Sequence, residues 1–128
     1  MKTRLLLAGL LITILLGCEA RLQDQRTLTL EIGEIQAIPI STVDHEQTLK
    51  VIASSPDAPI DVHIYLQEHE QDIERSITLG KQPENVLAQT SAAEQIDLEA
   101  IIPANKEAVV RFYTTGRQRA NVEVTISN

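Results

Sequence analysis

Apolar and polar side chains alternate one by one along most of this chain, and that period of two constrains the fold more than any other feature. The clearest example is residues 60–66, IDVHIYL. On one face of this segment every residue is aliphatic: Ile60, Val62, Ile64 and Leu66. Successive side chains of a β-strand point to opposite faces, so the pattern predicts a strand with one buried face, at the centre of the core.

Further segments repeat the alternation and are separated by turn residues. They are predicted as strands at residues 27–32, 35–40, 49–54, 77–79, 96–102, 108–113 and 122–126. Residues 83–93 fit a helix or a strand, and strand is favoured because strands flank the stretch. Eight or nine short strands with little helix predict an all-β fold. We expect an antiparallel β-sandwich of immunoglobulin-like or jelly-roll type, with about eight strands.

Two stretches depart from this alternation. Pro39 lies inside a predicted strand and cannot donate a backbone hydrogen bond, so that strand is expected at a sheet edge or at a bulge. Residues 68–74, EHEQDIE, contain a single apolar residue, Ile73. They are predicted to form an exposed loop or one helical turn.

The first 20 residues follow a different pattern. Lys2 and Arg4 precede an apolar run from Leu5 to Leu16, which is the arrangement of an export signal. The run is shorter than the roughly 20 apolar residues that a membrane-spanning helix needs. We therefore predict a signal that is removed.

The end of that run, Leu15-Leu16-Gly17-Cys18, resembles the lipobox of bacterial lipoproteins. The resemblance implies that Cys18 is acylated through diacylglycerol, that the signal is cut between Gly17 and Cys18, and that the acyl chains hold the protein on a membrane. It divides the chain into a signal at 1–17, an acylated cysteine and tether at 18–26, and a β-sandwich domain at 27–128. Because Glu19 is not the aspartate that retains lipoproteins of enteric bacteria in the inner membrane, the implied location is the outer membrane, facing the periplasm.

Composition restricts the partners. Lys2 and Arg4 leave with the signal, so 9 of the 11 basic residues remain in the mature chain. Against the 18 acidic residues this gives a net charge of −9. Such a surface repels nucleic acid and anionic headgroups, and attachment to the membrane should come from the lipid anchor alone. The aromatic residues are only two tyrosines and one phenylalanine, with no tryptophan. Recognition of sugars and bases usually relies on aromatic side chains, so both are disfavoured.

No catalytic motif is complete. Both His45-Glu46 and His69-Glu70 begin like a zinc-protease motif, but Leu49 and Ile73 stand where the second histidine is required. The chain has no G-x-S-x-G, no glycine-rich phosphate loop, and one cysteine. We therefore expect a protein that is not an enzyme and that uses no cofactor.

Two clusters are candidate binding sites. The densest acidic run, with His63 five residues earlier, suggests a divalent-cation site, although a solvated loop is favoured because the spacing matches no calcium loop; its residues are Glu68, His69, Glu70, Asp72 and Glu74. The second cluster would form an amphipathic interaction patch on the outward faces of two strands if those strands are neighbours: His63, Tyr65, Arg111 and Tyr113. Ordinary cross-strand packing is the alternative, and it is favoured.

The segments DVHIYL (61–66) and NVEVTI (121–126) are similar to strands of the small jelly-roll domains that follow bacterial secreted peptidases. That resemblance implies a non-catalytic accessory module. The sequence therefore favours a cell-envelope lipoprotein whose β-sandwich binds another envelope protein. The alternatives are a module that binds a small ligand or divalent cation at residues 63–74, and a hydrolase with an unfamiliar site.

Overall fold

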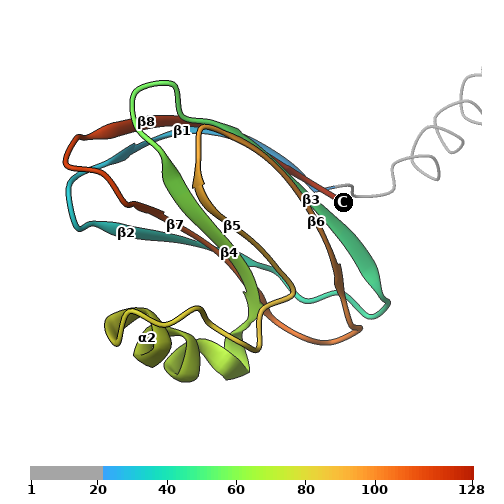
Figure 1. Ribbon diagram of the computed structural model, residues 1–128. Helices are drawn as coiled ribbons and strands as arrows, with labels where there is room; N and C mark the ends of the chain where they lie inside the picture. The colour runs from blue at the N-terminus through green and yellow to red at the C-terminus, as the bar shows by residue number, and fades with distance from the viewer. Residues whose placement is uncertain (1–21) are drawn as a thin grey trace, which may run out of the picture.

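The computed structural model describes residues 22–128. Eight strands form two four-stranded antiparallel sheets, which confirms the predicted all-β sandwich (Figure 1). The first sheet has the order β1-β8-β3-β6, made of Gln23–Leu30, Ala120–Ser127, Gln47–Ser54 and Gln95–Ile102. The second has the order β2-β7-β4-β5, made of Ile35–Ile40, Ala108–Thr114, Ile60–Leu66 and Ala88–Ala93. The predicted signal, the lipobox and Cys18 lie outside the described residues.

The core lies between the two sheets, where the alternating aliphatic residues meet. Ile60, Val62 and Ile64 of β4 are completely buried, as are Leu49 and Val51 of β3 in the facing sheet. Strands β3 and β4 are central in their sheets, so a neighbouring strand flanks each of them on both sides. Strand β2, which contains Pro39, is an edge strand, as the missing amide donor of proline requires.

The structure corrects the prediction of an exposed loop or one helical turn at 68–74 and of a strand at 77–79. A 3-10 turn, η1 (Gln67–His69), leads into a helix, α2 (Glu70–Thr78). Ile73 and Ile77 are four residues apart, so the helix places both on the side that packs against the sheet. Acidic residues in the first turn also favour the helix.

Two boundaries also differ from the prediction. Strand β5 covers only residues 88–93 of the expected 83–93 stretch. Strand β1 begins at Gln23 rather than at Thr27, because residues 23–26 pair with residues 124–127 of β8. Four residues assigned to the tether are therefore part of the sheet.

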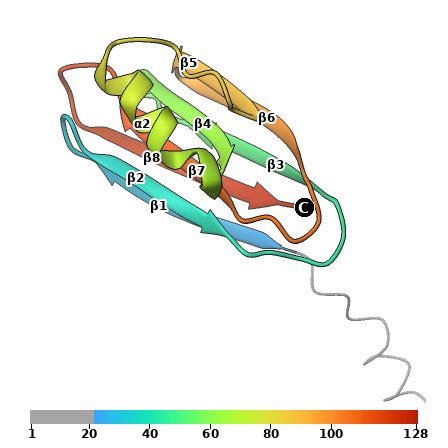
Figure 2. The same ribbon diagram turned by 90° about the horizontal axis from the view of Figure 1, so that it is seen from below.

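Helix α2 makes the fold asymmetric. It lies across the outer face of the β2-β7-β4-β5 sheet, over β4 and β7 (Figure 2). The other sheet, β1-β8-β3-β6, lies on the opposite side of the molecule, and no described helix covers its outer face (Figure 1). Within residues 22–128 there is no helix of the length and hydropathy required to cross a membrane.

The two ends of the described chain are joined. The Leu22 amide donates to Asn128 Oδ1 at 2.7 Å, and the Asn128 amide donates to the Leu22 carbonyl at 3.3 Å. Asn128 Nδ2 also donates to Oε1 of the buried Gln47 at 3.0 Å. These contacts fix the point at which the chain enters the domain.

Candidate functional site

The four residues of the expected interaction patch do lie on neighbouring strands. In the β4–β7 pair, His63 is opposite Arg111, and Asp61 is opposite Tyr113. Helix α2 covers this region, however, and Tyr65, His63 and Arg111 are only 1%, 3% and 4% exposed. Tyr113 alone is partly accessible. A partner protein cannot reach the other three in this structure. Their cover was missed because the sequence predicted an exposed loop or one helical turn, followed by a short strand, in place of α2.

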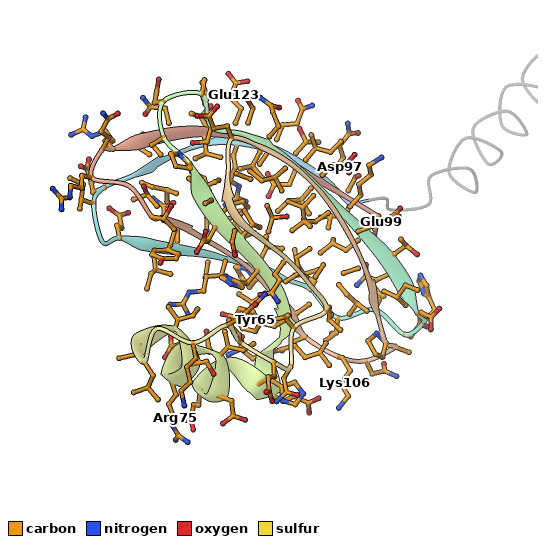
Figure 3. All side chains as sticks on the ribbon, viewed as in Figure 1. Tyr65, Arg75, Asp97, Glu99, Lys106 and Glu123 are labelled. Carbon is orange, nitrogen blue, oxygen red and sulfur yellow. The ribbon has the colours of Figure 1, made fainter. Side chains whose placement is uncertain are left out.

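Tyr65 holds the helix on the sheet. It forms a small apolar cluster with Ile73 of α2 and Val109 of β7, separate from the main core. Figure 3 shows Tyr65 between the sheet and the helix. Burial raises the pKa of the Tyr65 hydroxyl, and the carboxylate of Glu70 acts in the same direction. The residue therefore serves as a neutral packing group, which matches the cross-strand packing alternative.

Arg111 is a buried charge with a single acidic partner among the described residues. Its Nη1 lies 3.9 Å from Oε1 of Glu74, whose side chain is 58% exposed. Arg111 Nε has no hydrogen-bond partner among the described residues. Burying an arginine is unfavourable unless its charge is paired, so this contact helps to hold α2 over the sheet.

A cavity of about 420 Å³ lies beside this cluster, between the end of α2 and strands β4 and β5. Its polar side chains come from β4, β5 and β7, and the segment after α2 closes it. The lining residues are Asp61, His63, Ile77, Gly80, Lys81, Gln82, Pro83, Gln89, Ser91 and Tyr113. Gly80 has a φ of +69°, a left-handed conformation that lets the chain turn back along the sheet after the helix.

Two buried polar atoms at this cavity lack hydrogen-bond partners among the described residues. They are Nδ1 of His63 and Oε1 of Gln89, which come from directly opposed positions of β4 and β5. Buried polar groups are usually bonded, so each exception calls for an explanation. Asp61 is partly satisfied, because its Oδ1 accepts a 2.7 Å hydrogen bond from the Ala92 amide.

His63 is held in its neutral form. Burial is the main cause that lowers its pKa, and the nearby positive charge of Arg111 lowers it further. Asp61 opposes both effects by favouring the protonated ring. A neutral imidazole keeps one nitrogen as an acceptor, so His63 can accept a hydrogen bond inside the cavity.

Lowering the pH from about 7 to about 5 is expected to destabilise the wild-type protein more than a His63→Leu variant. The folded-state pKa of His63 is below its ordinary value of 6.5, so the unfolded chain binds the proton first. Stability contributed by the neutral ring is fully present above that value and is lost as the pH falls toward the folded-state pKa. Thermal melts at both pH values measure the difference. The control is His45→Leu, which removes an exposed histidine; an equal change in both variants would contradict the prediction.

The acidic run does not form a compact cation site. Glu68 contacts Lys106 Nζ at 3.2 Å, Glu70 accepts from Gln67 at 2.5 Å, and Glu74 faces Arg111. His69 Nε2 lies 3.8 Å from Glu68, and Asp72 is exposed on α2. In the part of the chain that the structure describes, no three His, Cys, Asp or Glu side chains converge as metal ligands.

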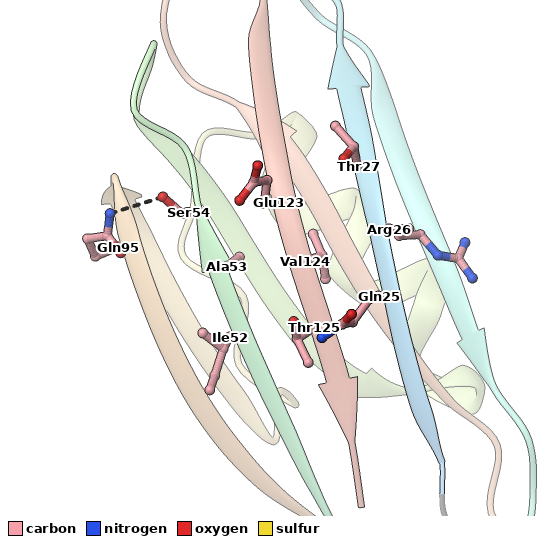
Figure 4. Close-up of a pocket in the computed structure, with 10 residues that line it drawn as sticks. All are labelled: Gln25, Arg26, Thr27, Ile52, Ala53, Ser54, Gln95, Glu123, Val124 and Thr125. Atoms are coloured by element: carbon pink, nitrogen blue, oxygen red, sulfur yellow. Dashed lines mark hydrogen bonds between the residues drawn. The ribbon is translucent and has the colours of Figure 1, made fainter.

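The uncovered face of the β1-β8-β3-β6 sheet carries a second, more open hollow of about 430 Å³ (Figure 4). Ile52, Ser54, Glu123 and Thr125 line it from β3 and β8. Figure 3 places Asp97, Glu99 and Glu123 on this side of the molecule, away from α2. Ile52 and Ile101 are 46% and 58% exposed on the same sheet. Ile52 could have indicated this face from the sequence. It is an apolar residue on the side of its strand where the neighbouring residues are polar.

Comparison with known proteins supports the fold but names no family. No protein-family model and no curated protein matches the chain. Among solved structures, it is similar to the pre-peptidase C-terminal domain of collagenase from Bacillus anthracis, with 11% identity and a TM-score of 0.59, covering 82% of this chain and 89% of that one. It is also similar to the Yersinia pseudotuberculosis-derived mitogen, with 8% identity and a TM-score of 0.57, covering 84% of this chain and 86% of that one.

These similarities define the class of the protein at the level of architecture. The chain is a small β-sandwich domain with the fold of the pre-peptidase C-terminal domain. The sequence resemblance of residues 61–66 and 121–126 to peptidase-associated jelly-roll domains agrees with this fold. Those segments lie within β4 and β8.

Proposed function

We propose that this chain is a cell-envelope lipoprotein, anchored through Cys18 to the outer membrane and facing the periplasm, whose non-catalytic β-sandwich binds another envelope protein. The observation that carries the proposal is the asymmetry of the domain. Helix α2 covers one sheet, whereas the outer face of β1-β8-β3-β6 remains accessible and carries two exposed isoleucines, Ile52 and Ile101.

The charge of this face indicates the chemistry of its partner. Asp97 and Glu99 on β6 and Glu123 on β8 are exposed. The basic residues beside them are Lys50, which lies opposite Glu99, and Arg26, which pairs with Asp24. Complementary charges guide association and select partners. The partner would therefore present lysine or arginine side chains around an apolar contact that receives Ile52.

The proposed anchor would be separated from the domain by only a short stretch of chain. Cys18 precedes Leu22 by four residues, a span of at most roughly 14 Å when fully extended. Leu22 is tied to Asn128, so the edge of the sandwich that contains both residues would face the membrane. In that orientation the β1-β8-β3-β6 face would lie next to the membrane surface, where another protein of the same envelope could reach it.

A hydrolase is a weaker alternative, even though Asp61, His63 and Ser91 line one cavity. His63 Nδ1 has no hydrogen bond to either residue. A nucleophilic serine requires a base in hydrogen-bond contact, and that base requires an orienting group. The cavity offers groups suited to binding, and the described residues contain no formed catalytic triad.

A Cys18→Ser variant is expected to lose its membrane attachment. Two or three acyl chains contribute about 0.8 kcal/mol per buried methylene, and once the signal is removed the proposal gives the mature chain no other attachment to lipid. After extraction with a phase-separating detergent, the wild-type protein should enter the detergent phase and the variant the aqueous phase. Mass spectrometry should show diacylglycerol on Cys18 of the wild type. An unmodified Cys18 in wild-type protein recovered from the detergent phase would contradict anchoring through this residue.

Cross-linking in intact cells tests the interaction face. The wild type should capture one envelope protein in near-stoichiometric yield, and an Ile52→Lys/Glu123→Lys variant should capture it roughly tenfold less well or worse. The matched control is Ile35→Lys/Glu34→Lys, which makes the same charge change at an exposed isoleucine of the other sheet. Equal capture by both variants would contradict the assigned face, and no specific capture by the wild type would contradict the proposed function.

A further inference from the structure

The cavity beneath the segment that follows α2 is independent of the proposed protein-binding face. It lies on the opposite sheet, and its polar groups come from three strands that are distant in the sequence. His63 is only 3% exposed, and its Nδ1 has no partner among the described residues. The Gln89 side chain, directly across the strand pair, also leaves its buried Oε1 without one. A cavity that is open to solvent and contains two such atoms can offer them to a polar ligand.

The buried polar atoms that lack partners at this cavity can act as acceptors. Gln89 Oε1 accepts only, and the neutral ring of His63 provides one accepting nitrogen. Asp61 adds a carboxylate, and the hydrogen bond from Ala92 occupies only its Oδ1. A ligand that satisfied all three side chains would need several N–H donors on one small group, and a positive charge to pair with the carboxylate.

We propose that this cavity binds a small molecule with a primary ammonium group. The three N–H donors of the ammonium would be directed to Asp61, His63 and Gln89. The carbon chain of the ligand would lie against Ile77 and Pro83, which form the apolar part of the wall. A volume of about 420 Å³ is large enough for a compact aliphatic amine.

The surrounding charges are compatible with a cationic ligand. Arg111 lies opposite His63, but it is not among the residues that line the cavity, and Glu74 offsets its charge at 3.9 Å. Lys81 also lines the cavity, from the exposed segment after α2, where solvent screens its charge. Asp61 is partly buried, so its charge is the less screened of the two, and it favours an ammonium over a carboxylate of the same size.

Nuclear magnetic resonance of the full-length protein in detergent micelles tests the proposal. The probes are butylammonium, 1-butanol and butyrate, which share a four-carbon chain and differ in the head group. Butylammonium at up to tens of millimolar should shift the ring signals of His63 and the side-chain amide of Gln89 along a saturable curve. The absence of any shift, or an equal shift with butanol or butyrate, would overturn the proposal.

Asp61→Asn locates the charge that selects the ligand. Asparagine keeps an oxygen that can accept the hydrogen bond from the Ala92 amide, but it removes the negative charge. The variant should bind butylammonium roughly tenfold more weakly or worse, because a hydrogen bond to a charged group is lost. Asp97→Asn, on the other sheet, should bind like the wild type. If Asp61→Asn does not fold, Gln89→Leu replaces it, and unweakened binding by the folded variant would overturn the assignment.

Discussion

Replacing Phe112 with alanine is expected to lower the free energy of unfolding by about 3–5 kcal/mol. Phe112 lies in β7 with its ring completely buried between the two sheets. It is the only phenylalanine of the chain, and the single cysteine excludes an internal disulfide. A domain of this size has a total stability of about 5–15 kcal/mol, so the loss would remove a large fraction of it. Urea denaturation should show a lower midpoint with an unchanged slope.

The matched control is Ile101→Ala, on strand β6 of the other sheet. Ile101 is 58% exposed on the outer face of β6, so its truncation should change the unfolding free energy by no more than about 0.5 kcal/mol. Similar losses for the two variants would contradict the assignment of Phe112 to the core between the sheets.

Replacing Ile73 with aspartate is expected to release α2 from the sheet while the sandwich stays folded. Ile73 is 1% exposed and packs on Tyr65 and Val109. Truncating a buried isoleucine costs about 2–5 kcal/mol, and an unpaired carboxylate in an apolar site adds to that cost. Because this cluster is separate from the main core, the cost can be avoided by local opening.

Hydrogen exchange measures this local opening. Amides of α2 should lose their protection in Ile73→Asp, whereas those of the central strands β3, β4 and β8 should keep most of it. The butylammonium response of His63 should also be lost, because the segment after α2 closes the cavity. Gln71→Asp introduces the same charge at an exposed position of the helix and should leave protection unchanged. Uniform loss of protection across the sheets of Ile73→Asp would show that α2 is part of the global folding unit.

The fold could be predicted because alternation is a local signal. Segments such as residues 49–54 and 96–102 each bury one face, and the strand period follows directly from that requirement. Helix α2 could not be predicted in the same way. Its buried face is defined by only two residues, Ile73 and Ile77, while Ile77 and Leu79 also satisfy a strand pattern. Tertiary contact with Tyr65 and Val109 decides between the two.

The site could be predicted only in part, because the register between strands is not a local property. The outward positions of His63 and Arg111 followed from the alternation, but their cover by α2 did not. The pairing of His63 with Gln89 depends on β5, whose start at Ala88 was not predicted. No sequence pattern joins Asp61, His63 and Gln89, so the cavity became visible only once the strands were in place.

The hydrogen bonds between Leu22 and Asn128 influence how the domain would respond to a pulling force. All eight residues of β1 pair with β8, and the chain enters β1 at the end where Leu22 is bonded to Asn128. If Cys18 is the attachment point, a pull between the membrane and a bound partner acts along β1. The hydrogen bonds of an antiparallel pair run perpendicular to the strands, so that tension shears them together. A tether joined after Leu30 would instead peel the same pairs apart one at a time.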